Sequence, residues 1–177
     1  MYIISRCLLG VNCKYNGGNN LKEYVIEFCN GHSCTSVCPE SVCLTAPRDP
    51  AEQITSEDGS FRVVDRSGRD LTVQFIEGSL QSVARAEKFA IERGEPIEGA
   101  ILKANSPSCG CGKIYNGEFN GTLVDGNGVF AQLMLDEFES FKAGKRTLIP
   151  GAAFSPDFTI ITEKDMQSEQ QGEQDCK

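Results

Sequence analysis

The chain lacks long apolar runs, and this absence argues against a membrane protein. No stretch of about 18 consecutive apolar residues occurs among its 177 residues, so no membrane-spanning helix is expected. The N-terminal segment has a short apolar stretch broken by Ser5, Arg6 and Cys7, without the long apolar region and cleavage site of a signal peptide. We therefore expect a cytoplasmic protein with no membrane partner.

Basic residues are also in deficit. The 17 lysines and arginines are outnumbered by 25 aspartates and glutamates, which gives a formal net charge of −8. Proteins that bind a nucleic acid duplex use cations to displace the counterions of the phosphates. The charge balance therefore predicts that a nucleic acid duplex is not a partner.

Repeats and an interdomain linker are absent too. The chain has the length of one ordinary domain, and its 40% content of hydrophobic residues is enough for one core. We expect a single domain over residues 1–165. The polar residues 166–177 are expected to form a frayed tail.

Cysteine is the residue present in excess, with nine in the chain. Without an export signal we do not expect a disulfide framework, because the cytosol keeps thiols reduced. Metal binding, thiol chemistry and simple burial remain as interpretations. The only histidine is His32, and no Cys-x2-Cys pair occurs. Two Cys-x4-Cys pairs, Cys29 with Cys34 and Cys38 with Cys43, leave a compact structural zinc site open.

Short apolar runs alternate along the chain with helical patterns. We expect strands at residues 2–5, 35–38, 99–103 and 158–161, and a small hairpin formed by residues 61–64 and 71–72. Helices are expected at residues 21–29, within 72–93, and from 127 to about 144. This alternation is typical of an α/β fold: a single three-layer domain with a mostly parallel sheet flanked by helices.

Three cysteines follow predicted strands at the point where each strand ends. Cys7 comes after residues 2–5, Cys38 ends the segment 35–38, and Cys109 follows residues 99–103. In parallel sheets, ligands bind beyond the carboxyl ends of the strands. The three thiols are therefore expected to converge on one crevice.

The residues around Cys38 suggest a second group in that crevice. Pro39 favours an extended conformation for Cys38, and side chains two positions apart on an extended segment point the same way. Cys38 and Glu40 would then face one site. A thiolate beside a carboxylate is unfavourable unless a cation or a raised carboxyl pKa relieves it, and a metal or cluster would do so. The alternative is that Glu40 is a solvated loop residue.

The segment before Cys109 resembles the start of a helical turn. Ser106 is a typical cap and Pro107 a typical first residue, which would place Cys109 where backbone N–H groups favour a thiolate. Lys103 could place a positive charge near the sulfurs, or extend to solvent. Three thiolates on separate loops suit an iron–sulfur cluster better than zinc. With only three cysteine ligands, one iron stays open as a Lewis acid.

Several motifs, in order along residues 1–142, resemble the thiouracil desulfurase family. They read CLLG (7–10), CKYNGG (13–18), VCPE (37–40), APR (46–48), LK (102–103), SPSCG (106–110), YNG (115–117) and GTL (121–123). The resemblance implies a 4Fe–4S cluster held by Cys7, Cys38 and Cys109, with the fourth iron open to the sulfur of a small thiolated base or nucleoside. Glu40 and Ser106 would line the substrate side.

The implied activity is desulfuration of a 2-thiouracil-like base to the oxo base. Water activated by Glu40 would attack the carbon, and the sulfur would leave as hydrosulfide without net electron transfer. The chain departs from the family pattern after Glu40, at the extra Cys111, and in a longer segment 139–156. Cys13, Cys43 and Cys111 therefore stay open as a fourth ligand. A thiol redox or sulfur-relay protein and a structural zinc module are the alternative functions.

Overall fold

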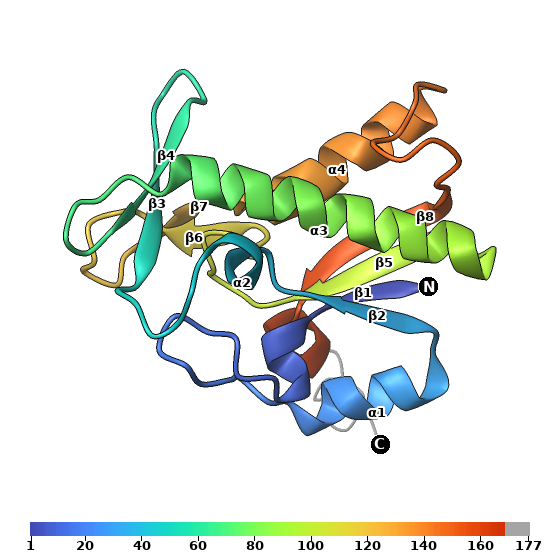
Figure 1. The fold of residues 1–177 in the computed structure, drawn as a ribbon, viewed down its shortest axis with the longest axis horizontal. Coiled ribbons are helices and arrows are strands. Elements are labelled where there is room, and N and C mark those ends of the chain that lie inside the picture. The colour runs from blue at the N-terminus through green and yellow to red at the C-terminus, as the bar shows by residue number, and fades with distance from the viewer. Residues whose placement is uncertain (169–177) are drawn as a thin grey trace.

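A four-stranded parallel sheet forms the centre of the computed structural model, which describes residues 1–168. The strands are β1 (Tyr2–Ser5), β2 (Cys34–Val37), β5 (Ile97–Leu102) and β8 (Phe154–Thr162), in the order β2-β1-β5-β8. Every neighbouring pair in this sheet is parallel (Figure 1). The predicted α/β fold with a mostly parallel sheet is confirmed.

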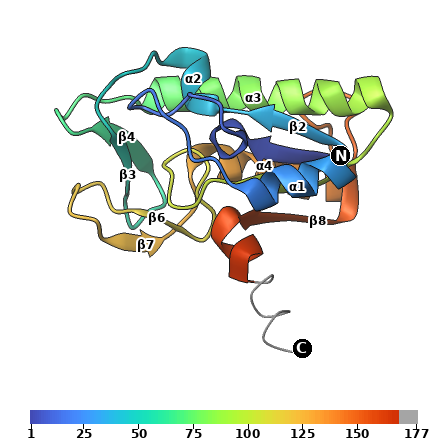
Figure 2. The ribbon, with the colours of Figure 1, turned by 90° about the horizontal axis from the view of Figure 1, so that it is seen from below.

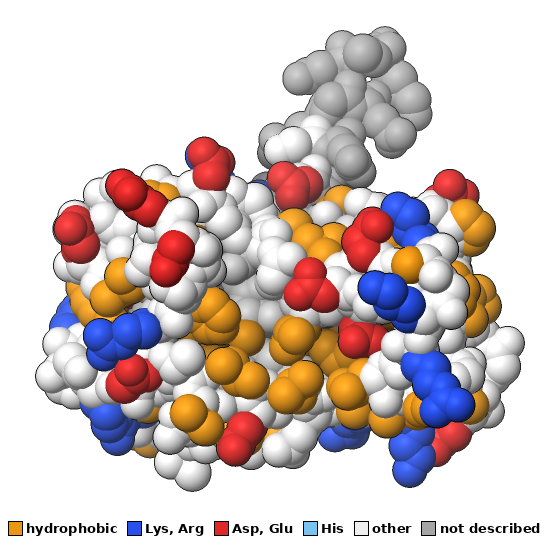
Figure 3. All heavy atoms as spheres, turned by 90° about the horizontal axis from the view of Figure 1, so that it is seen from above, with side chains coloured by type: hydrophobic (Ala, Val, Ile, Leu, Met, Phe, Trp, Pro, Cys, Tyr) orange, Lys and Arg blue, Asp and Glu red, His pale blue; other side chains and the backbone are white. Residues whose placement is uncertain are grey.

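Helices cover both faces of the sheet. The helices α3 (Thr72–Arg93) and α4 (Val129–Lys142) lie on one face, and α1 (Glu23–Gly31) lies on the other (Figure 2). Adjacent residues of a strand point to opposite faces, so Ile3 packs in the core under α3 and α4 whereas Ile4 packs with α1. On the outside of the α3 and α4 layer, hydrophobic side chains lie among acidic and basic ones (Figure 3). The three predicted layers are present.

The long helix was the most predictable element. α3 has the expected bounds, and it ends at Gly94, which has a φ of 65° and donates its backbone N–H to the carbonyl oxygens of Ala90 and Ile91. Glycine adopts this left-handed conformation without the steric cost of a Cβ. The strand expected at 158–161 is longer than predicted, because β8 begins at Phe154.

The predicted hairpin is wrong in one of its strands. The ladder of β4 (Phe61–Asp65) is with β3 (Ala51–Thr55). Residues 71–72 form no strand, although the Leu71 N–H donates to the Val63 carbonyl at 2.8 Å beside an isolated antiparallel bridge of Val64 with Asp70. Two polar side chains of β3, Glu52 and Gln53, are buried, so this strand does not show the apolar alternation that marks a strand in the sequence. Thr72 instead begins α3.

Small elements gather beyond the carboxyl ends of the parallel strands (Figure 1). They are the 3₁₀ turn η1 (Arg6–Leu9), the short helix α2 (Pro39–Cys43), and an antiparallel pair of β6 (Lys113–Tyr115) with β7 (Leu123–Asp125). Together with β3 and β4 they surround the edge of the sheet where the sequence predicts a crevice.

The chain continues past β8 in a helical segment, residues 163–168. Met166 in this segment is buried and packs in the cluster under α1, so the ordered domain includes this residue. The remainder of the expected tail, residues 169–177, lies outside the described residues. Within residues 1–168, no helix has both the length and the apolar character needed to cross a bilayer.

Candidate active site

A cavity of about 420 Å³ lies at the carboxyl edge of the sheet, within the size range of small-molecule sites. Cys7, Cys38 and Cys109 all line it. Cys7 sits in η1 directly after β1, Cys38 follows β2, and Cys109 lies in a turn after β5. The structure therefore brings the three predicted thiols together, as expected from the parallel sheet.

Cys7 and Cys38 both contact a fourth thiol, that of Cys13. Side-chain hydrogen bonding with Cys38 and with Cys7 raises the pKa of Cys13, and Cys38 Sγ also lies 3.7 Å from the Cys13 carbonyl oxygen. Hydrogen bonds from Cys13 and then from the Asn20 amide, whose Nδ2 lies 3.6 Å from Sγ, lower the pKa of Cys7. The Cys13 bond, followed by bonds from Ser41, lowers the pKa of Cys38 to about 6. The site therefore stabilises negative charge on Cys7 and Cys38.

The conformation of Cys38 follows from the proline after it. Cys38 is extended, with φ −142° and ψ 93°, and Pro39 is the first residue of α2. Glu40 lies in the first turn of this helix and lines the same cavity as Cys38. The predicted proximity of Cys38 and Glu40 is thus present, although a helical turn and not an extended segment produces it.

Cys109 sits in a single turn that Ser106 caps. Ser106 Oγ accepts the backbone N–H groups of Ser108 and Cys109, both at 3.2 Å, and the Gly110 N–H closes the turn on the Ser106 carbonyl at 2.8 Å. The predicted cap is present, but its expected effect on the thiol is not. Burial raises the pKa of Cys109, which is 6% exposed. A metal would have to displace this proton to bind the thiolate.

Glu40 connects the α2 helix to the Ser106 turn. Its Oε1 accepts the Ser108 hydroxyl at 2.8 Å and the Ser106 hydroxyl at 3.3 Å, while Oε2 pairs with the Arg48 guanidinium. The side chains of Arg48 and Glu40 are 8% and 17% exposed, so this is not the solvated loop carboxylate of the alternative interpretation. Arg48 supplies the cation that a carboxylate beside a thiolate requires.

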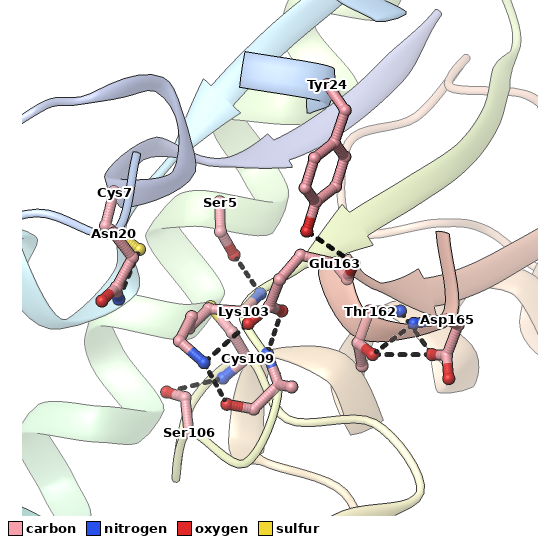
Figure 4. Close-up of polar contacts among 11 residues, drawn as sticks. Ser5, Cys7, Asn20, Tyr24, Lys103, Ser106, Cys109, Thr162, Glu163 and Asp165 are labelled. Atoms are coloured by element: carbon pink, nitrogen blue, oxygen red, sulfur yellow. Dashed lines mark hydrogen bonds and ion pairs between the residues drawn. The ribbon is translucent and has the colours of Figure 1, made fainter. Parts of the chain in front are cut away.

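Lys103 is paired with a residue that the sequence did not single out. Lys103 Nζ donates to Glu163 Oε1 and to the Ala104 carbonyl, both at 2.8 Å (Figure 4). Glu163 Oε2 accepts the Ala104 backbone N–H at 2.6 Å. Lys103 lines the cavity, and its charge adds a minor contribution to the lowered pKa of Cys7. It therefore acts inside the site rather than extending to solvent.

Three aromatic side chains line the cavity and form what we call its aromatic wall. Tyr15, Tyr115 and Phe119 line it, and the Arg66 guanidinium lies 5.6 Å from the centre of the Phe119 ring. Glu52 Oε2 fixes this wall by accepting the Phe119 backbone N–H at 2.9 Å. Flat aromatic faces pack well against a planar heterocycle.

The remaining thiols separate into two groups. Of the three left open as a fourth ligand, only Cys13 lines the cavity. Cys43 packs toward Gly78 of α3 and lines a second, shallow pocket, and Cys111 Sγ lies 4.0 Å from the Ile160 carbonyl. Cys29 and Cys34 contact each other where β2 begins, at the other end of this strand from Cys38. The two Cys-x4-Cys pairs therefore do not form one zinc site.

The donor set fits an iron–sulfur cluster better than a single ion. No group of three or more His, Cys, Asp and Glu side chains within residues 1–168 is arranged to hold one metal ion. Ligands of a cubane bind different irons and so stand farther apart than the ligands of one ion. Three thiols from separate elements line one cavity, and thiolates are the soft ligands that hold iron–sulfur clusters.

Three residues of the site were missed or left without a role by the sequence. Ser108 and Arg48 lie within family motifs, and that position is the signal that could have found them. Glu163 follows the last strand, where nothing in the sequence separates it from a polar tail. Its partner Lys103 is 60 residues away in the chain, so only the fold reveals the pair.

The chain matches the 2-thiouracil desulfurase family over residues 2–144. It is 38% identical over 140 residues to the uncharacterized protein YbbK of Bacillus subtilis (strain 168), and this alignment covers 76% of the chain and 89% of YbbK. Among solved structures, its fold is similar to that of the 4Fe-4S-dependent thiouracil desulfidase TudS. The TM-score is 0.65 at 28% identity, with 97% of this chain and 95% of TudS covered.

Proposed function

This chain belongs to the 2-thiouracil desulfurase family, and on that premise we propose that it removes sulfur from a small thiolated nucleobase or nucleoside. The products are the oxo base and hydrosulfide. The observation that carries the proposal is the shared cavity, in which three thiols from separate strand ends face a carboxylate held by two serine hydroxyls.

Cys7, Cys38 and Cys109 are the residues proposed to hold a 4Fe–4S cluster. The similarity to TudS, which is named as 4Fe-4S-dependent, supports this cofactor. With three protein ligands, the bound cluster would supply an open iron that acts as a Lewis acid toward the sulfur of the substrate. Cys13 lies within contact of two of the ligands and stays a neighbouring thiol in this proposal.

Glu40 is proposed as the group that takes a proton from the attacking water. Its carboxylate accepts the hydroxyls of Ser106 and Ser108, which fix its orientation, and Arg48 balances its charge. The water oxygen forms a bond to the thiocarbonyl carbon and one of its protons passes to Glu40. The carbon–sulfur bond then breaks, the second proton leaves the oxygen and goes with the sulfur as hydrosulfide, and the carbon keeps the oxygen as a carbonyl. No electrons are gained or lost, so no external reductant is required.

The aromatic wall is proposed to position the base. Tyr115 and Phe119 line the same cavity as the three thiols. A pyrimidine stacked there would direct its sulfur toward the proposed cluster ligands and its carbon toward Glu40.

A turnover assay with 2-thiouracil under anaerobic conditions tests this function. We expect uracil and hydrosulfide in equal amounts from the iron-loaded protein, and a loss of most turnover in Glu40→Gln with the iron content unchanged. Replacement of Cys29, which lies outside the cavity, is the matched control and should leave both quantities unchanged. Absence of hydrosulfide from an iron-loaded protein would contradict the proposal. Turnover that survives removal of iron by a chelator would instead favour a sulfur-relay protein.

A further inference from the structure

The helical segment after β8 supplies a buried carboxylate, that of Glu163, which pairs with Lys103, a residue that lines the thiol-lined cavity. We infer that Glu163 is a positioning residue that holds Lys103, and the start of the loop leading to Cys109, in place beside the proposed cluster. Glu163 lies beyond residues 2–144, the part of the chain that matches the family. The inference rests on the proposed function and adds to it a residue from the C-terminal segment.

Both carboxylate oxygens of Glu163 form hydrogen bonds with the residues that directly follow β5. Oε1 accepts the Lys103 ammonium and Oε2 accepts the Ala104 backbone N–H, so one carboxylate fixes a side chain and the adjoining main chain. The Glu163 residue is 2% exposed. Burying a carboxylate this deeply costs free energy unless it is paired and hydrogen-bonded. Lys103 and the Ala104 N–H therefore stabilise the Glu163 carboxylate in this position.

The segment that carries Glu163 is itself anchored. The Tyr24 hydroxyl of α1 donates to the Glu163 carbonyl at 2.8 Å. Asp165 Oδ2 accepts the backbone N–H of Thr162 at 2.8 Å and its hydroxyl at 2.7 Å, an arrangement that caps the helical segment. Met166 is buried in the core under α1. These contacts fix the segment that carries Glu163, so its carboxylate is in position to bind Lys103.

The pairing leaves Lys103 one further hydrogen bond to make. An ammonium group has three N–H donors, and Glu163 and the Ala104 carbonyl take two of them. Lys103 lines the cavity together with Cys7 and Cys109, so the third donor is available to an anionic sulfur there. Glu163 balances the charge of Lys103, so the cavity gains a directed donor without a net positive charge.

The same loop continues from Ala104 to Ser106, whose cap shapes the Cys109 turn. Outer residues that orient the ligands of a metal site affect activity by about 10- to 100-fold when they are replaced. Loss of the Glu163 carboxylate should therefore disturb the reaction through Lys103 and this loop, even though Glu163 is only an indirect part of the reacting centre.

The test compares anaerobically loaded wild-type protein with Glu163→Gln, with Asp157→Asn, an exposed carboxylate on β8, as the matched control that also removes one negative charge. For Glu163→Gln we expect unchanged iron content, a more positive reduction potential of the cluster because one nearby negative charge is lost, and a fall in kcat/KM for 2-thiouracil of about tenfold or more. For Asp157→Asn, which leaves the Lys103 pair and the cap of the Glu163 segment intact, we expect the wild-type potential and kcat/KM.

The double variant Lys103→Met with Glu163→Gln removes both charges. The reduction potential of the cluster in this double variant should return toward the wild-type value, while turnover of 2-thiouracil stays low. A merely structural role of Glu163 would not produce this combination. If Glu163→Gln does not fold, the Lys103→Met variant alone tests the inference. We expect its cluster to have a more negative reduction potential than the wild-type cluster, because one nearby positive charge is lost.

A wild-type potential and kcat/KM in Glu163→Gln, or equal losses in Asp157→Asn, would overturn the inference. Wild-type protein that binds no iron would instead contradict the proposed function.

Discussion

At the scale of single residues, the two serine hydroxyls that bond to Glu40 lead to the most specific prediction about the site. Ser108 makes the shorter bond to Glu40, at 2.8 Å, and its hydroxyl lies 3.1 Å from that of Ser106 but does not itself accept the backbone N–H groups of the Cys109 turn. Ser106 makes the longer bond, at 3.3 Å, and its hydroxyl caps that turn. The two serines therefore share one partner and differ in their second role.

We expect Ser108→Ala to lower kcat for 2-thiouracil while the iron content stays at the wild-type level, because only the orientation of Glu40 is weakened. Ser106→Ala should lower both quantities, and the lost cap should cost about 1 kcal/mol of stability in the turn. Iron analysis beside steady-state kinetics checks both variants. An intact iron content in Ser106→Ala would show that the cap does not position Cys109.

Residue roles were predictable where one side chain lies close in sequence to its neighbours in the site. Glu40 lies two residues after Cys38, and Ser106 three before Cys109, so local geometry was enough to suggest a shared site. The pairs of Arg48 with Glu40 and of Glu163 with Lys103 depend on how separate segments fold together. Cys109 shows a further limit, because its burial outweighs the effect expected from the helical turn.

At the scale of elements, the contact of α2 with α3 fixes the position of Cys38 and Glu40. A Cβ placed on Gly78 of α3 would overlap the carbonyl oxygen of Pro39, so only glycine allows the two helices to approach this closely. The helix α2 has only five residues and depends on this support.

Gly78→Ala should therefore displace α2, lower the stability by about 1–3 kcal/mol, and reduce turnover through the moved Glu40. The matched control is Gly31→Ala at the end of α1, where an added Cβ meets no atom within 4 Å. Thermal unfolding and the 2-thiouracil assay measure the two effects. Equal behaviour of the two variants would show that the α2–α3 contact does not support the site.

Elements were predictable in proportion to their length and to the regularity of their apolar pattern. The 22-residue α3 keeps a helical period throughout, and the buried strands β1 and β5 have short apolar runs. The strands β6 and β7 have three residues each, too few to establish a period. β3 was missed because its inward side chains are polar and serve the cavity wall, as Glu52 does at the Phe119 backbone.

At the scale of the whole molecule, the parallel sheet explains why residues far apart in the chain meet. The carboxyl ends of all four strands lie at one edge of the sheet. A cysteine of the site follows each of β1, β2 and β5 at that edge. This convergence followed from the predicted fold class alone. The aromatic wall did not, because it belongs to irregular loops and the small β6–β7 pair.

The central claim is that Cys7, Cys38 and Cys109 share one cluster while Cys13 does not bind it. The most direct measurement is the iron and labile sulfide content of anaerobically prepared wild-type protein, Cys109→Ser and Cys13→Ala. The account predicts about four irons and four sulfides per chain in the wild type and in Cys13→Ala, and loss of the cluster in Cys109→Ser. A colourless wild-type protein with stoichiometric zinc, or a full iron content in Cys109→Ser, would contradict it.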